Sequence, residues 1–371
     1  MPLLQEHAIA THETIAAAHL SLSMKKILIL GANGFIGHHL SRAILATTEW
    51  QIVGMDLGSH RLTPMLDNPR MSFHERDMLT STAWIDEQVA ACDVVLPLVA
   101  IATPATYVRD PLRVFELDFE ANLPIVRMCV KHKKRLIFPS TSEVYGMCTD
   151  TEFDPESSDL VVGPINKPRW IYSVSKQLMD RIIHAYGLKG ELDYTLFRPF
   201  NWIGEGLDSL TASNPGGARV ITQFIGHIIR GEPIQLVDGG SARRSFTDVE
   251  DAIGALMTII DNPRGIATGK IYNIGNPANN HSVRDLAEML LKLAPEYAEY
   301  QAGAAKSKIV VATAEEYYGV GYQDVQFRTP RITNTVDELD WLPKVTMARA
   351  LRKILEAYRA EAAAITKAQS A

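Results

Sequence analysis

The stretch Ile27-Leu28-Ile29-Leu30-Gly31-Ala32-Asn33-Gly34-Phe35-Ile36-Gly37 decides the fold of this chain. Its four leading apolar residues are typical of a strand buried on both faces, and a helical pattern at 38–46 follows the glycines. Three glycines in the order G-x-x-G-x-x-G allow a tight turn, a close approach of backbone to a pyrophosphate, and close packing of helix on strand. The helix N-terminus adds amide donors for phosphate. The stretch therefore predicts a dinucleotide-binding strand–turn–helix unit.

Strands and helices alternate through the first 200 residues. Further apolar runs predict strands at 51–55, 94–99, 136–138, 195–197 and 270–274, with helices at 111–131 and 171–186. This alternation predicts an α/β fold, a Rossmann-like doubly wound parallel sheet. Beyond residue 200 the pattern breaks into short strands and helices at 220–230, 249–260, 283–293 and 347–358. We expect a smaller mixed C-terminal substrate-binding region there, without a second sheet of comparable size.

Composition excludes several classes of protein. The formal net charge of −6 over 371 residues gives no general attraction to nucleic acid or to acidic lipid. No apolar run approaches the length of a membrane span. The three cysteines, Cys92, Cys129 and Cys148, are far apart and lack metal-site spacing, so we expect neither disulfides nor a metal and a reducing, cytoplasmic compartment.

A carboxylate at the end of the second strand bears on the choice of cofactor. Asp56 lies 19 residues after Gly37, where it can accept hydrogen bonds from ribose hydroxyls and repel a 2′-phosphate, which favours NAD over NADP. Two alternatives stay open: Asp56 could be a turn residue before Gly58, and Arg61 could accommodate a phosphate. Asp77 could either cap a turn or face the adenine.

The chain also carries a catalytic tyrosine–lysine pattern. Tyr172 and Lys176 are four residues apart, so they lie on one face of a helix. An ammonium beside a phenol is expected to lower the phenol pKa, which lets the tyrosine take a proton from an alcohol near neutral pH. The pair could also occur by chance, but the segment Ser140–Gly146 (STSEVYG) precedes it.

Taken in this order, the glycines, Asp56, the 140–146 segment and the Tyr172/Lys176 pair resemble the extended short-chain dehydrogenase/reductase (NAD-dependent epimerase/dehydratase) family. The resemblance implies that Tyr172 is the base and that Lys176 holds the nicotinamide ribose and tunes Tyr172. It also implies that Thr141 or Ser142 binds a sugar. The cofactor residues implied for NAD are Gly31, Asn33, Gly34, Phe35, Ile36, Gly37, Asp56, Asp77, Ala100, Tyr172 and Lys176.

Longer strings are more specific than the glycines. Within the family the chain most resembles the UDP-glucuronic acid decarboxylase (dehydrogenase) domains of the bacterial lipid A aminoarabinose pathway, here as a stand-alone protein. The strings that carry this resemblance are PLVAIATP (97–104), NKPRWIY (166–172), FRPFNW (197–202) and YYGVGYQDVQFR (317–328).

The resemblance implies a domain plan and an assembly. The plan is an N-terminal extension at 1–23, an NAD-binding domain at 24–201 with 246–275 returning to it, a nucleotide-sugar region at 202–245 and 276–359, and an Ala-rich tail at 360–371 that we expect to fray. A homodimer through 111–131 and 171–186 is expected.

The implied reaction is oxidation at C4 of UDP-glucuronate followed by loss of CO2. A cation and an acid are then needed beside C5 and C6, and the resemblance assigns Arg328, Glu143 and Ser142 there. The implied contacts with the UDP-sugar are Tyr107, Arg169, Asn201, Arg219, Arg244 and Tyr322. Any of these could instead be a structural ion pair or a packed aromatic.

Two departures from the look-alike affect the nucleotide side. Gly204-Glu205-Gly206-Leu207 stands where the family often has Gly-Pro-Arg, and Gln235 replaces a basic residue. The product is expected to be UDP-4-keto-pentose with NADH, and UDP-xylose stays possible because both use the same residues. The alternatives are a UDP-glucuronate 4-epimerase and a non-catalytic NAD-binding sensor.

Overall fold

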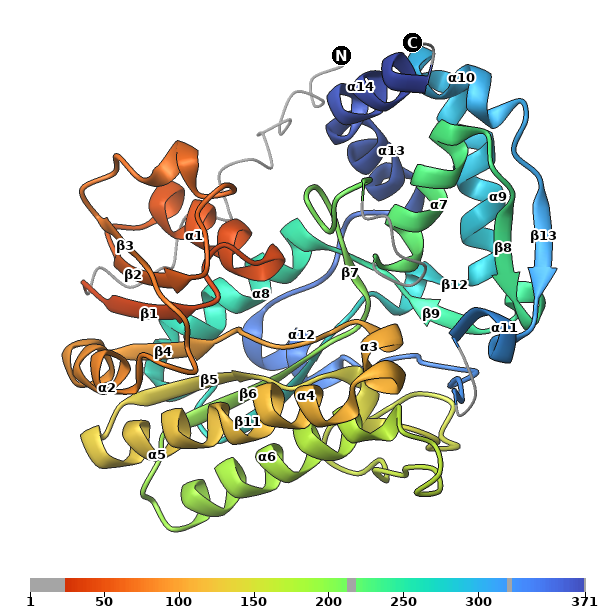
Figure 1. Ribbon diagram of the computed structural model, residues 1–371. Coiled ribbons are helices and arrows are strands. Elements are labelled where there is room, and N and C mark those ends of the chain that lie inside the picture. The colour runs from red at the N-terminus through yellow and green to blue at the C-terminus, as the bar shows by residue number, and fades with distance from the viewer. Residues whose placement is uncertain (1–23, 212–217, 319–321, 370–371) are drawn as a thin grey trace, which may run out of the picture.

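A central parallel sheet organises the protein (Figure 1). The computed structural model describes residues 24–211, 218–318 and 322–369, so the predicted extension 1–23 and part of the 317–328 string lie outside the described residues. Seven parallel strands follow the order β11-β6-β5-β4-β1-β2-β3, which confirms the Rossmann-like prediction. The strands are β1 (Lys26–Leu30), β2 (Gln51–Asp56), β3 (Met71–Glu75), β4 (Val94–Pro97), β5 (Arg135–Pro139), β6 (Tyr194–Pro199) and β11 (Lys270–Ile274).

Alternate side chains of β1 enter two different cores. Ile27 and Ile29 belong to the core shared with helices α1 (Phe35–Thr47) and α8 (Val249–Asp261). Leu28 and Leu30 belong to the core on the other face, under α2 (Thr82–Ala91), α5 (Asn122–His132) and α6 (Trp170–Leu188). Because successive side chains of a strand point to opposite faces, an all-apolar strand needs helices on both sides, and Figure 1 shows both layers.

The sequence patterns missed several elements and merged three others. The edge strand β3 and helix α2 were not predicted, since β3 (M-S-F-H-E) buries only its first residue. The predicted helix at 111–131 is three elements: α4 (Pro111–Phe115), a π-helical turn η2 (Glu116–Glu120) and α5. The N–H of Ala121 donates to Glu116 O at 2.9 Å, and the extra residue turns Asp118 into the interior.

The C-terminal region contains small sheets and helices beside the main sheet (Figure 1). Three two-stranded sheets pair β7 (Trp202–Ile203) with β10 (Thr247–Asp248), β9 (Arg243–Ser245) with β12 (Asn280–Ser282), and β8 (Ile234–Val237) with β13 (Ile309–Ala312). None of the described helices is long and apolar enough to cross a membrane. The remaining helices are α3 (Pro104–Arg109), α7 (Val220–Arg230), α9 (Val283–Leu293), α10 (Ala298–Ala304), α11 (Ala314–Tyr318), α12 (Thr333–Leu339), α13 (Met347–Ala357) and α14 (Arg359–Gln369).

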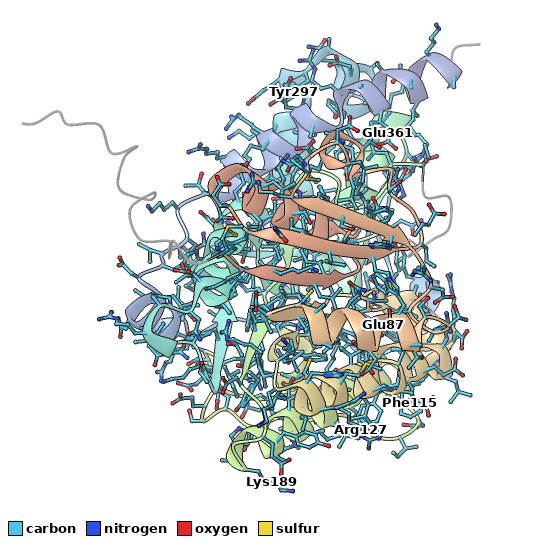
Figure 2. The ribbon with its side chains drawn as sticks, turned by 90° about the vertical axis from the view of Figure 1, so that its left-hand side faces the viewer. Glu87, Phe115, Arg127, Lys189, Tyr297 and Glu361 are labelled. Carbon is cyan, nitrogen blue, oxygen red and sulfur yellow. The ribbon has the colours of Figure 1, made fainter. Side chains whose placement is uncertain are left out.

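The prediction that the tail frays from residue 360 is wrong. Residues 359–369 form α14, which buries Ala362 completely. Glu361, labelled near the top of Figure 2, accepts hydrogen bonds from the Leu210 N–H at 2.9 Å and from the Ser209 hydroxyl at 3.0 Å. The alanine-rich composition is that of a good helix former, and packing against a distant loop holds the helix in place.

Candidate active site

The glycine turn sits where the strand order reverses, between β1 and β4. Gly31 has φ +92°, and a Cβ on it would lie 3.0 Å from the Val99 backbone nitrogen in the segment after β4. A Cβ on Gly37 would lie 2.2 Å from Gly31 O, so only glycine lets α1 pack this closely on the turn. A turn whose glycines carry no side chains, at the first turn of α1, fits a pyrophosphate. These residues therefore suit NAD, the cofactor expected from the sequence.

Asp56 supports the glycine turn. Its Oδ2 accepts the Asn33 N–H at 2.8 Å and its Oδ1 accepts the Leu57 N–H at 2.8 Å. Each carboxylate oxygen keeps a second lone pair, so the side chain can still accept from a ribose hydroxyl. Arg61 donates to Asn33 O at 3.1 Å, so its guanidinium is already engaged at this turn.

Asp77 has the capping contact that the sequence analysis allowed. Its Oδ1 accepts the Leu79 N–H at 2.9 Å. Its carboxylate therefore caps the turn after β3, and an adenine contact stays a prediction. Ala100 is half-buried in the segment between β4 and α3, on the side where the glycine turn approaches Val99.

Tyr172 lies in a dry, aromatic environment at the start of α6. Its ring stacks on Tyr107 of α3 with centroids 4.6 Å apart and planes 9° apart. Burial, and after it the charge of Asp118, raise the pKa of Tyr172 well above its ordinary value, while a hydrogen bond with Thr141 opposes the rise. The expectation that Lys176 lowers this pKa is therefore wrong for the protein on its own, because the ammonium is committed elsewhere.

Lys176 is held by groups other than Tyr172. Its Nζ donates to Pro139 O at 3.0 Å and lies 3.6 Å from Asp118 Oδ1. Both side chains are buried, with exposed fractions of 1% for Lys176 and 0% for Asp118. Sequence reasoning missed Asp118, since nothing in a helical pattern marks which carboxylate a π-turn will direct inward.

Glu143 lies between two arginines. Its Oε2 is 2.7 Å from Arg169 Nη2, and its Oε1 is 2.5 Å from Arg328 Nη1. Burial alone would raise the pKa of Glu143, but the charges of Arg169 and Arg328 outweigh it and hold this pKa below its usual value. Burial lowers the pKa of Arg328, and the charge of Glu143 opposes that change. The structure thus brings together three predicted residues that are distant in the sequence.

Several donors of this cluster have no hydrogen-bond partner within the described residues. They are buried, and they belong to three of the predicted substrate and catalytic residues: Arg169 Nε and Nη1, Arg328 Nε, and Asn201 Nδ2. Buried polar groups are normally paired, so unpaired donors indicate a site for an acceptor such as a carboxylate or a sugar oxygen.

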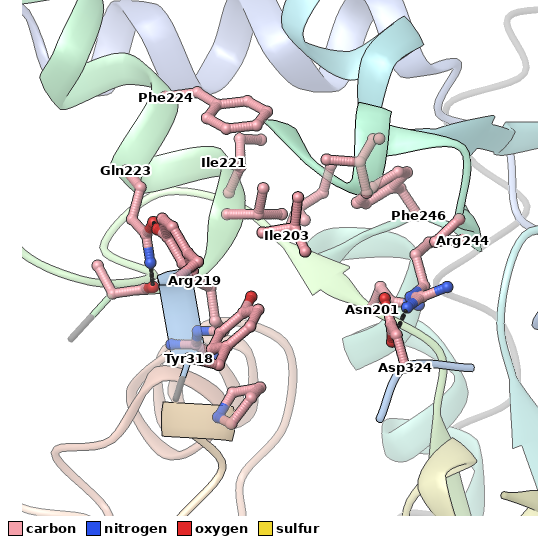
Figure 3. Close-up of a pocket in the computed structure, with 18 of the residues that line it drawn as sticks. Asn201, Ile203, Arg219, Ile221, Gln223, Phe224, Arg244, Phe246, Tyr318 and Asp324 are labelled. Carbon is pink, nitrogen blue, oxygen red and sulfur yellow. Dashed lines mark hydrogen bonds and ion pairs between the residues drawn. The ribbon is translucent and has the colours of Figure 1, made fainter. Parts of the chain in front are cut away.

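A cavity runs from this cluster into the C-terminal region (Figure 3). Its lining includes the charged residues Glu143, Arg169 and Arg328, and it has an apolar part in which Figure 3 shows Ile203, Ile221 and Phe224 together. Figure 3 shows Arg244 beside Asp324 and Asn201 on one side, and Arg219 and Tyr318 on the other. Seven of the predicted site residues line this cavity, and Gln235 lines it as well; the seven are Glu143, Arg169, Asn201, Arg219, Arg244, Tyr322 and Arg328.

Arg219 and Arg244, two further arginines of the cavity, are also ion-paired. The sequence analysis allowed for such structural ion pairs. Arg219 Nη2 lies 2.8 Å from Asp208 Oδ1, and Arg244 Nη2 lies 2.6 Å from Asp324 Oδ1. Tyr322 stacks on Tyr318 at 4.0 Å and faces the Arg169 guanidinium at 5.4 Å. These contacts hold the arginines in place without removing them from the cavity wall.

Three further predicted residues, Tyr107, Thr141 and Ser142, are not among the described residues that line the cavity. Tyr107, expected to bind substrate, packs on Tyr172, and its pKa is raised by burial. Thr141 accepts the Glu143 N–H at 3.2 Å, and Ser142 begins the 3-10 turn η3 (Ser142–Tyr145) that directs Glu143 into the cluster. In the described part of the chain, no group of three or more His, Cys, Asp or Glu side chains is arranged to hold a metal ion.

The fold and the site define a dinucleotide-binding α/β protein whose tyrosine and lysine lie beside a cavity that carries arginines. Residues 27–275 match the model of the NAD dependent epimerase/dehydratase family. The chain belongs to this family, so it is of the NAD-dependent type that modifies nucleotide sugars.

Solved structures agree with this assignment. The chain is 58% identical to the PbgP3 protein from Burkholderia pseudomallei, with 93% of this chain and 99% of that chain covered and a TM-score of 0.84. It shares the fold of UDP-glucose 4-epimerase from Thermotoga maritima, solved with UDP-glucose (21% identity, 91% and 99% covered, TM-score 0.73). It also shares the fold of dTDP-glucose 4,6-dehydratase from Bacillus anthracis, solved with NAD (19% identity, 91% and 97% covered, TM-score 0.72).

Proposed function

We propose that this protein is an NAD-dependent UDP-glucuronate decarboxylase that oxidises C4 of the sugar and releases CO2 from C6. The observation that carries the proposal is the buried Arg169–Glu143–Arg328 cluster. All three residues line the cavity, and guanidinium N–H groups of both arginines lack a partner among the described residues. A uronic acid brings a carboxylate, the group that arginine forks bind best. An epimerase acting on an uncharged sugar needs no such cluster.

The first step removes two hydrogens from the C4 carbinol. Tyr172 takes the hydroxyl proton, with Thr141 in hydrogen-bond contact to orient the phenol. NAD, which the glycine turn, Asp56 and Lys176 would hold, would supply the hydride acceptor and a positive charge. The cofactor's charge would oppose the effect of burial on the pKa of Tyr172, so that the tyrosine could act as the base in the complex.

The second step breaks the C5–C6 bond. A C4 ketone is β to the C6 carboxylate, so the bonding electrons move into an enolate as CO2 leaves, and C5 then takes up a proton. Arg328 and Arg169 would hold the carboxylate in place and stabilise the enolate charge. Because burial lowers the pKa of Arg328, this residue is also our candidate donor of the C5 proton, with Glu143 and Ser142 orienting it.

The apolar part of the cavity, with Ile203, Ile221 and Phe224, would bind the nucleotide. Arg219 and Arg244 supply positive charge along its wall, and Gln235 stands at its exposed rim without a charge of its own. We expect the ketone to leave before reduction, which gives UDP-4-keto-pentose and NADH. Return of the hydride would give UDP-xylose from the same residues.

The experiment that tests the proposal is product identification. Purified protein with UDP-glucuronate and NAD should release CO2, raise NADH absorbance and give UDP-4-keto-pentose by NMR. Arg328→Lys keeps a positive charge but loses the fork, so CO2 release should fall roughly 10²-fold, the loss typical of a lost transition-state donor. Formation of UDP-galacturonate without CO2 would replace the proposal with a 4-epimerase.

A control separates an enzyme from a non-catalytic NAD-binding sensor. Tyr172→Phe should abolish turnover by roughly 10²–10⁴-fold while NAD binding, followed by fluorescence, is retained. If wild-type protein binds NAD but turns over no uronic or neutral UDP-sugar, the sensor is supported instead.

We further propose a homodimer through α4, η2, α5 and α6. These elements expose apolar side chains: Leu112 is 69% exposed, Leu178 44% and Val174 41%. Figure 2 shows Phe115 and Arg127 on this outer helical layer. Leu178→Glu should convert a dimer to a monomer by light scattering, whereas a wild-type monomer at micromolar concentration would contradict the proposal.

A further inference from the structure

Asp118 is a buried carboxylate that the proposed reaction does not use. It lies in the π-turn η2 with no exposed surface, in contact with two parts of the site. Its Oδ2 accepts the Ile101 N–H at 3.0 Å, and its Oδ1 lies 3.6 Å from Lys176 Nζ. Oδ1 makes no hydrogen bond within the described residues, so the lysine ammonium is the group it faces.

The contact at Ile101 connects Asp118 to the segment that borders the glycine turn. Val99, two residues before Ile101, approaches Gly31, and Pro104 begins the helix that carries Tyr107. Tyr107 in turn stacks on Tyr172. Asp118 therefore contacts both Lys176 and the segment after β4. This segment leads into α3, whose Tyr107 ring packs on Tyr172.

The charge of the buried Lys176 gives a second reason to expect a role for Asp118. An ammonium that is 1% exposed is costly unless a counter-charge is close, and Asp118 supplies it. The other carboxylate near Lys176 is Asp180, which already pairs with Arg198 at 3.3 Å and accepts the Ser140 hydroxyl at 2.7 Å. Of these two carboxylates, Asp180 is thus shared with an arginine, and Asp118 is the counter-ion available to Lys176.

We propose that Asp118 is a positioning residue that fixes the Lys176 ammonium at the cofactor side of the site and keeps it protonated. The proposal rests on the proposed function for the role of Lys176, and the π-turn is its structural basis. A regular helix from 111 to 131 would lack the extra residue that turns Asp118 inward.

The first test needs no activity. Asp118→Asn keeps an oxygen that can accept the Ile101 N–H and removes only the charge. Asp118→Asn should lower the melting temperature of the wild-type protein more than it lowers that of Lys176→Met, because Lys176→Met has already lost the ammonium. Equal losses in both backgrounds would overturn the ion pair as the reason for Asp118. Glu87→Gln, which changes an exposed carboxylate on α2 outside the proposed dimer face, is the control and should have no effect in either background.

The second test measures NAD binding, which tests the positioning itself. Asp118→Asn should weaken NAD affinity by about tenfold, the scale of one hydrogen bond to a charged group, and Glu87→Gln should leave it unchanged. Unchanged affinity in Asp118→Asn would overturn the positioning role. Loss of NAD binding in the wild type would count against the proposed function and leave the melting-temperature result intact.

The third test is the pH profile of turnover, and its sign follows from charge. The charge of Asp118 raises the pKa values of both Tyr172 and Lys176, so its removal should move both limbs of the kcat/KM profile to lower pH. A lower rate with unmoved limbs would mean a purely structural role. The charged and titratable groups that face Tyr172 and Lys176 are Asp118 of η2, Asp180 of α6, Tyr107 of α3 and Glu143 of η3. Arg198 of β6 pairs with Asp180.

Discussion

Tyr107 stacks on Tyr172 with ring planes only 9° apart, so one tyrosine fixes the orientation of the other. Offset-stacked rings at a centroid distance of 4.6 Å are a favourable aromatic geometry. The sequence suggested a substrate contact for Tyr107. In the structure its ring stacks on Tyr172, which suits a residue that positions Tyr172, and both roles make testable predictions.

Removal of the Tyr107 ring should affect turnover more than binding. Tyr107→Ala should destabilise the protein by about 3–4 kcal/mol, as large-to-small core substitutions do, and should lower kcat with little change in KM. Tyr107→Phe keeps the stack and should retain most stability in urea unfolding. A raised KM in Tyr107→Phe would support the substrate contact instead.

The glycine turn should not tolerate a methyl group at residue 37. Gly37→Ala places a Cβ 2.2 Å from Gly31 O, so α1 must move away from the turn that would hold the pyrophosphate. We expect NAD affinity to fall by more than about tenfold, the loss expected when backbone donors to a charged group are misplaced. Gly254→Ala in helix α8 is the control, because its Cβ would lie 3.8 Å from the Trp341 ring. Normal NAD binding in Gly37→Ala would show that the turn is not the cofactor site.

The Arg169–Glu143–Arg328 cluster should make stability depend on pH. The pKa of Glu143 is lowered in the folded protein, so its contribution is present above the unfolded pKa and is lost as pH falls through the folded value. Glu143→Gln should therefore cost about 3 kcal/mol near pH 7, the scale of a broken buried ion pair, and less below about pH 4. Urea unfolding across this pH range measures the difference. The prediction is contradicted if the difference in unfolding free energy between wild type and Glu143→Gln stays constant with pH. It is also contradicted if the exposed Glu191→Gln gives an equal difference.

The C-terminal helix should support the cavity. Glu361 accepts hydrogen bonds from Ser209 and Leu210, and Leu207 two residues earlier in that loop lines the cavity. Glu361→Ala should lower stability by about 1–2 kcal/mol through the lost acceptor and raise the KM for the UDP-sugar. Limited proteolysis should then cut the 204–211 loop faster. Glu356→Ala on the neighbouring helix, whose carboxylate contacts Arg359 at the surface, serves as the control.

Local chemistry was enough to predict the framework. The run Ile27–Leu30, the glycines and the regular strand–helix alternation predict a parallel sheet because periodicity and turn chemistry act over a few residues. The same locality explains the errors, which concern the half-exposed strand at 71–75, the π-turn inside a helical pattern and the tail that packs on a distant loop. The domain boundaries and the roles of the site residues stay predictions.

Sequence by itself therefore determined the α/β class and the glycine turn, and it predicted the members of the cluster, Glu143, Arg169 and Arg328. Only the tertiary structure decided that Glu143 lies between Arg169 and Arg328, and that Lys176 is paired with Asp118 and not with Tyr172. These pairings join residues far apart in the chain, and their strength comes from burial. Burial is a property of how helices and strands pack, so no local pattern could specify it.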